Sequence, residues 1–260
     1  MRSQMRGFTL MEIVIVIVLL GVMALFTTQF IGSGTRLYVD AAAREQLMND
    51  VRFGVERLNR ELRDAIPGSV SVAAGRECVT FWPVKAVTRY LQAPVSSAST
   101  TLIQFLPAVN SQNINAGDLA LIYPAGLDTS SAPYRCSHGA CALQVASLVT
   151  SAAQQTVTLQ AQSGASYNGG FATASPGQRV YYADRVVSYC QRGSQLQRSE
   201  QRLAGGAVQS SAMADDLQTA SFSMEDTAFN SSGEVMIRLL FSRRGESIQF
   251  SHLVEVVNVP

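Results

Sequence analysis

The sequence is poor in charge and in several reactive side chains. Only 15% of its residues are charged, and 20 Lys and Arg against 19 Asp and Glu leave a net charge of +1. Lys85 is its only lysine, and it has two histidines, His138 and His252, and one tryptophan. Because the chain has no basic cluster, it lacks the electrostatic footprint of a polyanion-binding protein. We therefore expect no nucleic-acid partner.

Recognisable catalytic motifs are missing as well. The sequence contains no G-x-S-x-G nucleophile turn, no glycine-rich phosphate loop and no H-E-x-x-H metal motif. We expect both histidines to be structural or exposed rather than catalytic. The composition thus favours a protein that is not an enzyme and that has no cofactor.

The longest apolar run lies near the N-terminus, from Phe8 to Ile31, after a short leader that carries Arg2 and Arg6. As a helix it would be roughly 36 Å long, enough to cross a hydrocarbon core of about 30 Å. A secretory signal places its small-residue cleavage site after the apolar region. Here Gly7 stands before it, so cleavage would leave the run on the mature protein. We expect a leader peptide over 1–7 and a retained transmembrane helix over 8–31.

One carboxylate, Glu12, interrupts this run. An acidic side chain costs about 2.5 to 3.5 kcal/mol at the centre of a membrane helix, so its presence there indicates a functional role and a cationic partner. The residues Gly7-Phe8-Thr9-Leu10-Met11-Glu12 resemble the processing motif of type IV prepilins and type II secretion pseudopilins. The alternative is a conventional signal peptide or simple anchor with an accidental Glu12, and Gly32-Ser33-Gly34 offers the nearest later cleavage site.

The resemblance implies roles for individual residues. A prepilin peptidase would cleave between Gly7 and Phe8 and methylate the new amine of Phe8. Glu12 would pair with an N-terminal amine in the growing filament and so set the register of the subunit. The apolar helix would then pack in the filament core.

A second helical segment is expected over 32–66. Its apolar residues recur every three or four positions, at Leu47, Val51, Val55, Leu58 and Leu62. The opposite face is charged, and the spacing predicts ion pairs between Glu56 and Arg60 and between Arg57 and Glu61. Ile66-Pro67-Gly68 ends the pattern, because the residue before proline is disfavoured in a helix. The two helical segments would form one rod whose second half lies on a sheet.

Beyond Pro67 the apolar period changes to two, and short segments alternate with turn residues. Strands are predicted near Cys78 to Trp82, Thr101 to Leu106, Asp118 to Tyr123, Thr156 to Ala161, Arg179 to Cys190 and Thr219 to Met224, before a hairpin of Val235 to Phe241 with Ile248 to Val259. We expect an α+β fold with a β-rich head over 67–260. With the resemblance, this is the type IV pilin fold, a long N-terminal helix packed on an antiparallel β-sheet.

Three long polar stretches interrupt the predicted strands, at Gln92 to Thr100, Pro124 to Ala142 and Gln162 to Gly177. Loops of this length are uncommon unless they are functional or flexible. Their side chains Tyr134, Tyr167, Asn168 and Phe171 would offer contacts to a partner subunit or a surface ligand. Plain solvated loops are an equal alternative.

Four cysteines, Cys78, Cys136, Cys141 and Cys190, follow the apolar run. An even number in an exported segment indicates two disulfides, for which three connectivities exist. We favour Cys136 with Cys141 and Cys78 with Cys190, worth about 2 and about 5 kcal/mol from loop closure. A metal site of Cys136, His138 and Cys141 is the alternative, although its spacing fits no common zinc pattern, and we expect no metal.

The segments Gly117 to Tyr123 and Val186 to Cys190 resemble the large minor pilins, most closely those of the mannose-sensitive haemagglutinin (MSHA) pilus, and the J-type minor pseudopilins. The resemblance implies a minor pilin that primes or caps the filament. Its partners would be prepilin peptidase, other minor pilins and the major pilin. It would span the bacterial inner membrane once, with its head in the periplasm, before joining the pilus at the cell surface.

Two other functions remain open at this point. One is a minor pseudopilin at the tip of the type II secretion pseudopilus. The other, of a different class, is a pilus-tip adhesin whose loops bind a glycan or another surface ligand.

Overall fold

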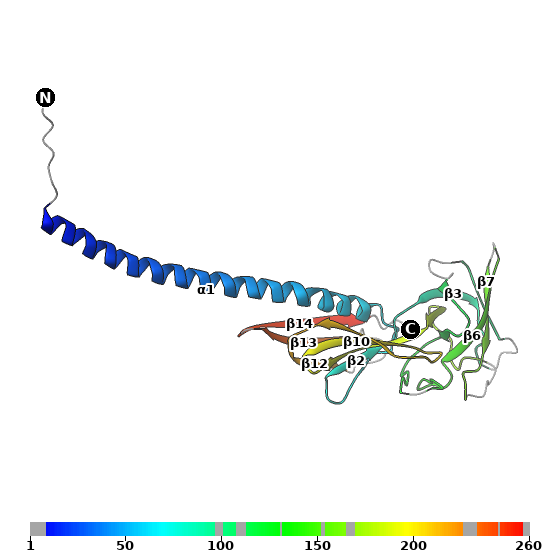
Figure 1. Cartoon of the computed structure of the whole chain (residues 1–260). Helices are drawn as coiled ribbons and strands as arrows, with labels where there is room; N and C mark the ends of the chain where they lie inside the picture. Colours follow the sequence, from blue (N-terminus) through cyan, green and yellow to red (C-terminus); the bar gives the residue numbers. More distant parts are fainter. Residues whose placement is uncertain are drawn as a thin grey trace, which may run out of the picture.

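The computed structural model describes residues 9–96, 101–107, 113–130, 132–151, 154–164, 170–225, 233–243 and 245–256. Within these residues a single long helix, α1 (Leu10–Arg63), is followed by strands β1 to β14. The helix projects far beyond the strands at its N-terminal end (Figure 1). The architecture is roughly α+β, with an N-terminal apolar helix followed by a head that is mostly antiparallel sheet.

Helix α1 runs without a break through the glycines at 32 and 34, and it curves gently along its length (Figure 1). Thr27 Oγ1 donates to the Met23 carbonyl at 2.8 Å, and Thr35 Oγ1 donates to the Ile31 carbonyl at 2.8 Å. Hydroxyls that bond back to the preceding turn commonly bend helices. The helix ends before Ile66, and Asp64 forms its C-cap.

Two antiparallel sheets pack beside the C-terminal half of α1. The first has the order β1 (Ser71–Val72), β2 (Cys78–Phe81), β9 (Arg185–Arg192), β10 (Gln195–Arg202) and β11 (Gln209–Ala214). The second has the order β12 (Leu217–Glu225), β13 (Gly233–Arg243) and β14 (Glu246–Val256). The stripe predicted on the helix, from Leu47 to Leu62, is buried in one core with residues of both sheets, as expected. The head contacts of α1 therefore rest mainly on apolar burial, at roughly 1.5 to 3 kcal/mol for each large side chain.

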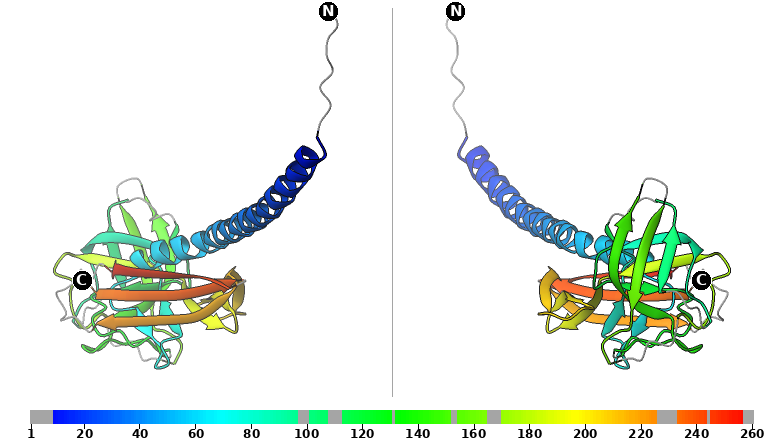
Figure 2. Two further views of the ribbon diagram at one scale, coloured as in Figure 1. Left: turned by 90° about the vertical axis from the view of Figure 1, so that its left-hand side faces the viewer. Right: turned by 90° about the vertical axis from the view of Figure 1, so that its right-hand side faces the viewer.

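The remaining six strands form a closed barrel with its own apolar core. Its order is β3 (Ala86–Gln92), β4 (Leu102–Phe105), β7 (Gln155–Gln160), β6 (Ala142–Thr150), β5 (Leu119–Leu121) and β8 (Arg179–Ala183). Along the chain the barrel lies between β2 and β9, which pair with each other in the first sheet. It is thus an insertion into the sheet-and-helix part, and it lies beyond the C-terminal end of α1 (Figures 1 and 2).

A third apolar cluster joins the barrel to the end of the helix. It contains Ile66 and Trp82 together with Leu121 and Tyr181 from the barrel strands. The Ile66 amide donates to the Trp82 carbonyl at 2.8 Å, which ties the segment after α1 to the segment that enters the barrel. Tyr134 packs edge-on against Trp82, with ring centroids 4.6 Å apart.

Several sequence predictions differ from this arrangement. The single strand predicted from Arg179 to Cys190 is two strands, β8 and β9, which separate at Asp184 and belong to different sheets. Strands β1, β3, β6, β10 and β11 lay outside the predicted set, and the predicted single sheet is two sheets and a barrel. The remaining predicted strands are present with slightly different ends. Asp184 lies between the four buried residues that end β8 and the alternating residues of β9, and no glycine or proline marks the point at which the chain changes sheets.

Candidate functional site: the N-terminal segment and the junction of the head

The N-terminal half of α1 packs against no other part of the chain that the structure describes. The span Leu10–Ile31 contains an 18-residue window with a mean hydropathy of 2.7, and it is long and apolar enough to cross a membrane. Its large side chains are exposed, from 45% at Val22 to 82% at Leu10. Exposed apolar surface of this extent marks a membrane or protein contact. This half of the helix is therefore the part of the chain that requires an apolar environment from outside.

The first turn of α1 gives Glu12 a local setting. Thr9 is the N-cap, and its Oγ1 accepts a hydrogen bond from the Glu12 amide at 3.3 Å. Thr9-Leu10-Met11-Glu12 has the spacing of a capping box, in which a hydroxyl residue precedes a glutamate by three. The sequence prediction gave Glu12 only an intermolecular role and missed Thr9, although the T-x-x-E pattern was readable. Gly7 and Phe8 lie outside the described residues.

A series of ion pairs that runs from Glu61 to Lys85 connects α1 with the barrel, and we call this series the ionic chain. At its helix end, Glu61 accepts hydrogen bonds from Arg57 Nε at 2.9 Å and from Arg198 Nε at 2.9 Å. Arg198, on β10, is buried and also donates from Nη1 to Glu200 at 2.8 Å. Tyr189 donates its hydroxyl to Glu61 at 3.1 Å. Glu61 was predicted to lie on the solvent face of α1, and the structure instead turns it toward β9 and β10.

These contacts shift the pKa of Glu61. Burial by itself raises the pKa of this carboxyl, but the hydrogen bonds from Arg198 and Arg57 outweigh burial and hold the pKa below its ordinary value. Burial and the nearby negative charge of Glu61 together raise the pKa of the Tyr189 hydroxyl. The predicted pair of Arg57 with Glu61 is present, whereas Glu56 pairs with Arg52 at 2.6 Å and not with Arg60 as predicted.

The other end of the ionic chain lies where the polypeptide enters and leaves the barrel. Lys85 Nζ lies 2.8 Å from Asp118 Oδ2 and 3.4 Å from Asp184 Oδ2. The Asp118 side chain is only 5% exposed and also accepts from the Asn115 amide at 2.7 Å. Lys85 precedes the first barrel strand and Asp184 follows the last, so the only lysine holds both connections of the insertion together.

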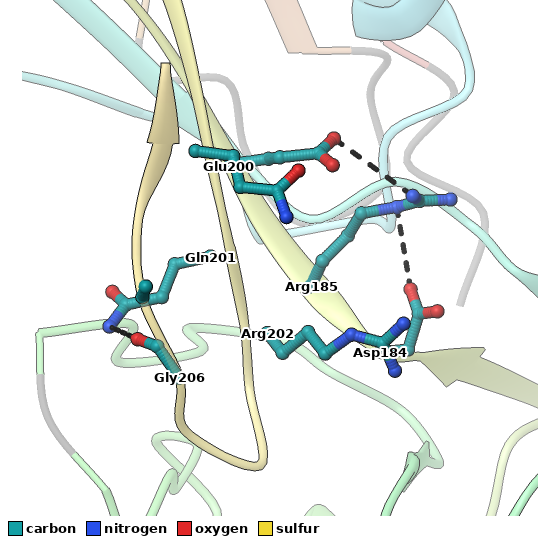
Figure 3. A pocket seen from close by; sticks show the side chains of 8 residues that line it. Asp184, Arg185, Glu200, Gln201, Arg202 and Gly206 are labelled. Carbon is teal, nitrogen blue, oxygen red and sulfur yellow. Dashed lines mark hydrogen bonds and ion pairs between the residues drawn. The ribbon is translucent and has the colours of Figure 1, made fainter.

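Arg185 links the two ends of the ionic chain, and it borders a pocket of about 290 Å³. Its guanidinium reaches between Asp184 and Glu200, with N to O distances of 3.4 Å and 3.9 Å (Figure 3). The pocket is lined by Asp184, Arg185, Glu200, Gln201, Arg202, Gly206, Ala207 and Gln209. All of the lining residues except Gly206 and Ala207 have polar or charged side chains, which is unusual for a pocket that binds an apolar molecule.

The comparison with known protein families concerns the N-terminal segment. Residues 2–28 match the model described as the prokaryotic N-terminal methylation motif. This methylation motif implies a substrate of prepilin peptidase of the type IV pilin kind. No curated protein and no solved structure matches the chain.

The methylation motif spans Gly7, Phe8 and Glu12, and its C-terminal limit lies inside the exposed half of α1. The cysteines lie far from it in the head. Cys78 is bonded to Cys190, its neighbour across β2 and β9, and Cys136 is bonded to Cys141. This is the connectivity that we favoured from the sequence, and because both thiols of the second pair are oxidised, the alternative metal site of Cys136, His138 and Cys141 is wrong.

The side chains proposed as loop contacts have different positions. Phe171 is 1% exposed and belongs to the barrel core, so it is not a surface contact group. Tyr134 is partly buried against Trp82. Tyr167 and Asn168 lie outside the described residues. The polar pocket and the ionic chain were absent from the sequence prediction, because Arg198 and Glu61 are 137 positions apart and no local pattern connects them.

Proposed function

We propose that the chain is a minor pilin, a non-enzymatic subunit that takes part in the assembly of a type IV pilus. The single observation that carries this proposal is the methylation motif at residues 2–28, joined directly to the exposed apolar half of α1. Before assembly, this half would lie in the inner membrane with the head in the periplasm. In the filament it would be buried among the equivalent helices of other pilins.

Assembly would give Glu12 the cation that this carboxylate needs in an apolar setting. In the described part of the molecule no cationic side chain pairs with Glu12. An N-terminal amine of a neighbouring subunit is a suitable partner, because a paired charge is far less costly in a low-dielectric environment than an isolated one.

The head supports a minor rather than a major subunit. A barrel inserted between β2 and β9 makes the head large, and the last cysteine, Cys190, lies well before the C-terminal hairpin. A bulky head is best accommodated where it has few neighbours, at the end of a filament. We therefore propose that the chain primes or caps the filament, and its resemblance to the minor pilins of the MSHA pilus favours a pilus of that kind.

A processing experiment tests the proposal. The intact mass and N-terminal sequence are measured for protein from membranes that contain or lack an active prepilin peptidase. We expect loss of residues 1–7 and a methylated Phe8 only when the peptidase is active. Gly7→Val should block cleavage, whereas Gly21→Ala, a change inside the span, should leave it intact. An uncut chain, or one cut after residue 31, would contradict the proposal.

The type II secretion pseudopilus is the alternative assembly, since pseudopilins are processed in the same way. Mass analysis does not separate the two. Purified pili and pseudopili that are probed for the processed chain would do so, and enrichment in pseudopili alone would favour the secretion system.

A further inference from the structure

The polar pocket beside Arg185, at one end of the first sheet, has no role in the proposed assembly. It is formed by the start of β9, the end of β10 and the connection from β10 to β11. Its lining combines two guanidiniums, two carboxylates and two amides (Figure 3). The chemistry of its occupant follows from which of these groups have unused hydrogen-bonding capacity.

Neither guanidinium in the pocket makes a hydrogen bond to a residue that the structure describes, although Arg185 forms ion pairs with Asp184 and Glu200. Arg185 is held only by charge, because its closest oxygens lie at 3.4 and 3.9 Å, longer than the 2.7 to 2.9 Å of charge-assisted hydrogen bonds. Arg202 is exposed, and its side chain pairs with no residue in the part of the chain that the structure describes. Two guanidiniums that border one small pocket form a site for an oxyanion, since each can present two parallel N–H groups to a carboxylate.

The same pocket also offers acceptors. Glu200 uses Oε2 for Arg198 and Arg185, which leaves Oε1 without a described hydrogen-bond partner. Gln201 donates from Nε2 to the Gly206 carbonyl at 3.2 Å, and this bond leaves its Oε1 as an acceptor. Gln209 is exposed and adds a group that both donates and accepts. A bare carboxylate would use only the guanidiniums, whereas a ligand that also carries hydroxyl groups would use the acceptors of Glu200 and Gln201 as well.

We propose that this pocket binds one acidic sugar unit, a hexuronate, of an extracellular polysaccharide. Arg185 and Arg202 bind the carboxylate of the sugar, and its ring hydroxyls donate to Glu200 and Gln201 and exchange hydrogen bonds with Gln209. A volume of about 290 Å³ suits a single sugar ring, at the lower end of the usual range for ligand pockets. The proposal requires an exported head but does not depend on which filament the chain joins.

Binding is tested by ligand-observed NMR with the full chain in detergent micelles. Methyl β-D-glucuronide is the probe. Methyl β-D-glucoside has the same ring without the carboxylate, and N-acetylglutamate N-methylamide imitates an acidic protein side chain. We expect the glucuronide to bind at least about tenfold more tightly than either control, since charge-assisted hydrogen bonds and hydroxyl contacts both contribute.

Arginine variants locate the site. Arg202→Gln should weaken glucuronide binding at least about tenfold without disturbing the fold, because the Arg202 side chain pairs with no other described group. Arg185→Gln should do the same. Arg192→Gln, at the other end of β9 and also exposed, is the matched control and should bind like the wild type.

Three outcomes would overturn the proposal. Equal affinity for glucuronide and glucoside would show that the carboxylate is not recognised. Unchanged glucuronide affinity in both Arg185→Gln and Arg202→Gln would place any binding elsewhere. Equal or tighter binding of the glutamate derivative would assign the pocket to an acidic side chain of a partner subunit. None of these outcomes depends on cleavage after Gly7, so failure here leaves the pilin proposal untouched.

Discussion

At the scale of single residues, Arg198 is a buried charged group that joins α1 to the head through Glu61, and Arg243 makes a second ion pair to α1 at Asp50. Its side chain is 9% exposed and bonds to both Glu61 and Glu200. In Arg198→Met, Glu61 keeps Arg57 but both carboxylates lose their buried partner, which should cost about 3 kcal/mol of unfolding free energy. Urea unfolding followed by the fluorescence of Trp82 measures this loss. Arg52→Met removes an exposed pair on the same helix and should leave the midpoint unchanged.

The pH dependence of the same variant provides a second readout. Because the pKa of Glu61 is lower in the folded state, the carboxylate stabilises the fold above its ordinary pKa of about 4.3. That contribution disappears as the pH falls through the lower, folded-state pKa. The wild type should therefore lose stability below about pH 4.3, and Arg198→Met should lose less over this range. If the two proteins lose the same unfolding free energy between about pH 5 and lower pH, Arg198 does not set the pKa of Glu61.

At the scale of elements, the contact of α1 with β11 depends on the absence of a side chain at Gly54. A Cβ at this position would lie 2.8 Å from the Met213 carbonyl oxygen. Replacing glycine by alanine inside an exposed helix normally stabilises by up to about 1 kcal/mol. We predict the opposite sign for Gly54→Ala, because backbone must move and the helix must separate from β11.

Thermal unfolding of the full chain in detergent checks the sign. Gly34→Ala is the matched control, since a Cβ there meets open space, and it should leave the unfolding midpoint unchanged or raise it. A raised midpoint in Gly54→Ala would show that α1 and β11 adjust to one another at little cost.

At the scale of the whole molecule, the Cys78–Cys190 disulfide closes a loop that contains the entire barrel. The two cysteines are 112 positions apart, against five for Cys136 and Cys141. Loop-closure entropy therefore predicts a loss of about 5 kcal/mol for the double variant Cys78→Ala/Cys190→Ala and of about 2 kcal/mol for Cys136→Ala/Cys141→Ala. Urea midpoints under non-reducing conditions give the order of the two losses. If the second variant loses more stability than the first, the two connections of the barrel are held together mainly by Lys85 and the surrounding apolar cluster.

The sequence by itself determined the features that are local along the chain. The methylation motif, the exposed apolar span and the buried stripe from Leu47 to Leu62 all follow from residue type and helical period, which report the environment of each face. The C-terminal hairpin of β13 and β14 follows from alternation on both sides of a short turn.

Only the tertiary structure decided how the head is divided. A period of two shows that a strand has one buried face, but it does not show which strand pairs with which. The sequence therefore did not reveal that β8 and β9, which meet at Asp184, belong to different sheets. The ionic chain from Glu61 to Lys85 and the pocket beside Arg185 depend on the same pairing. Their members come from distant segments, and they meet because β2 and β9 pair across the base of the inserted barrel.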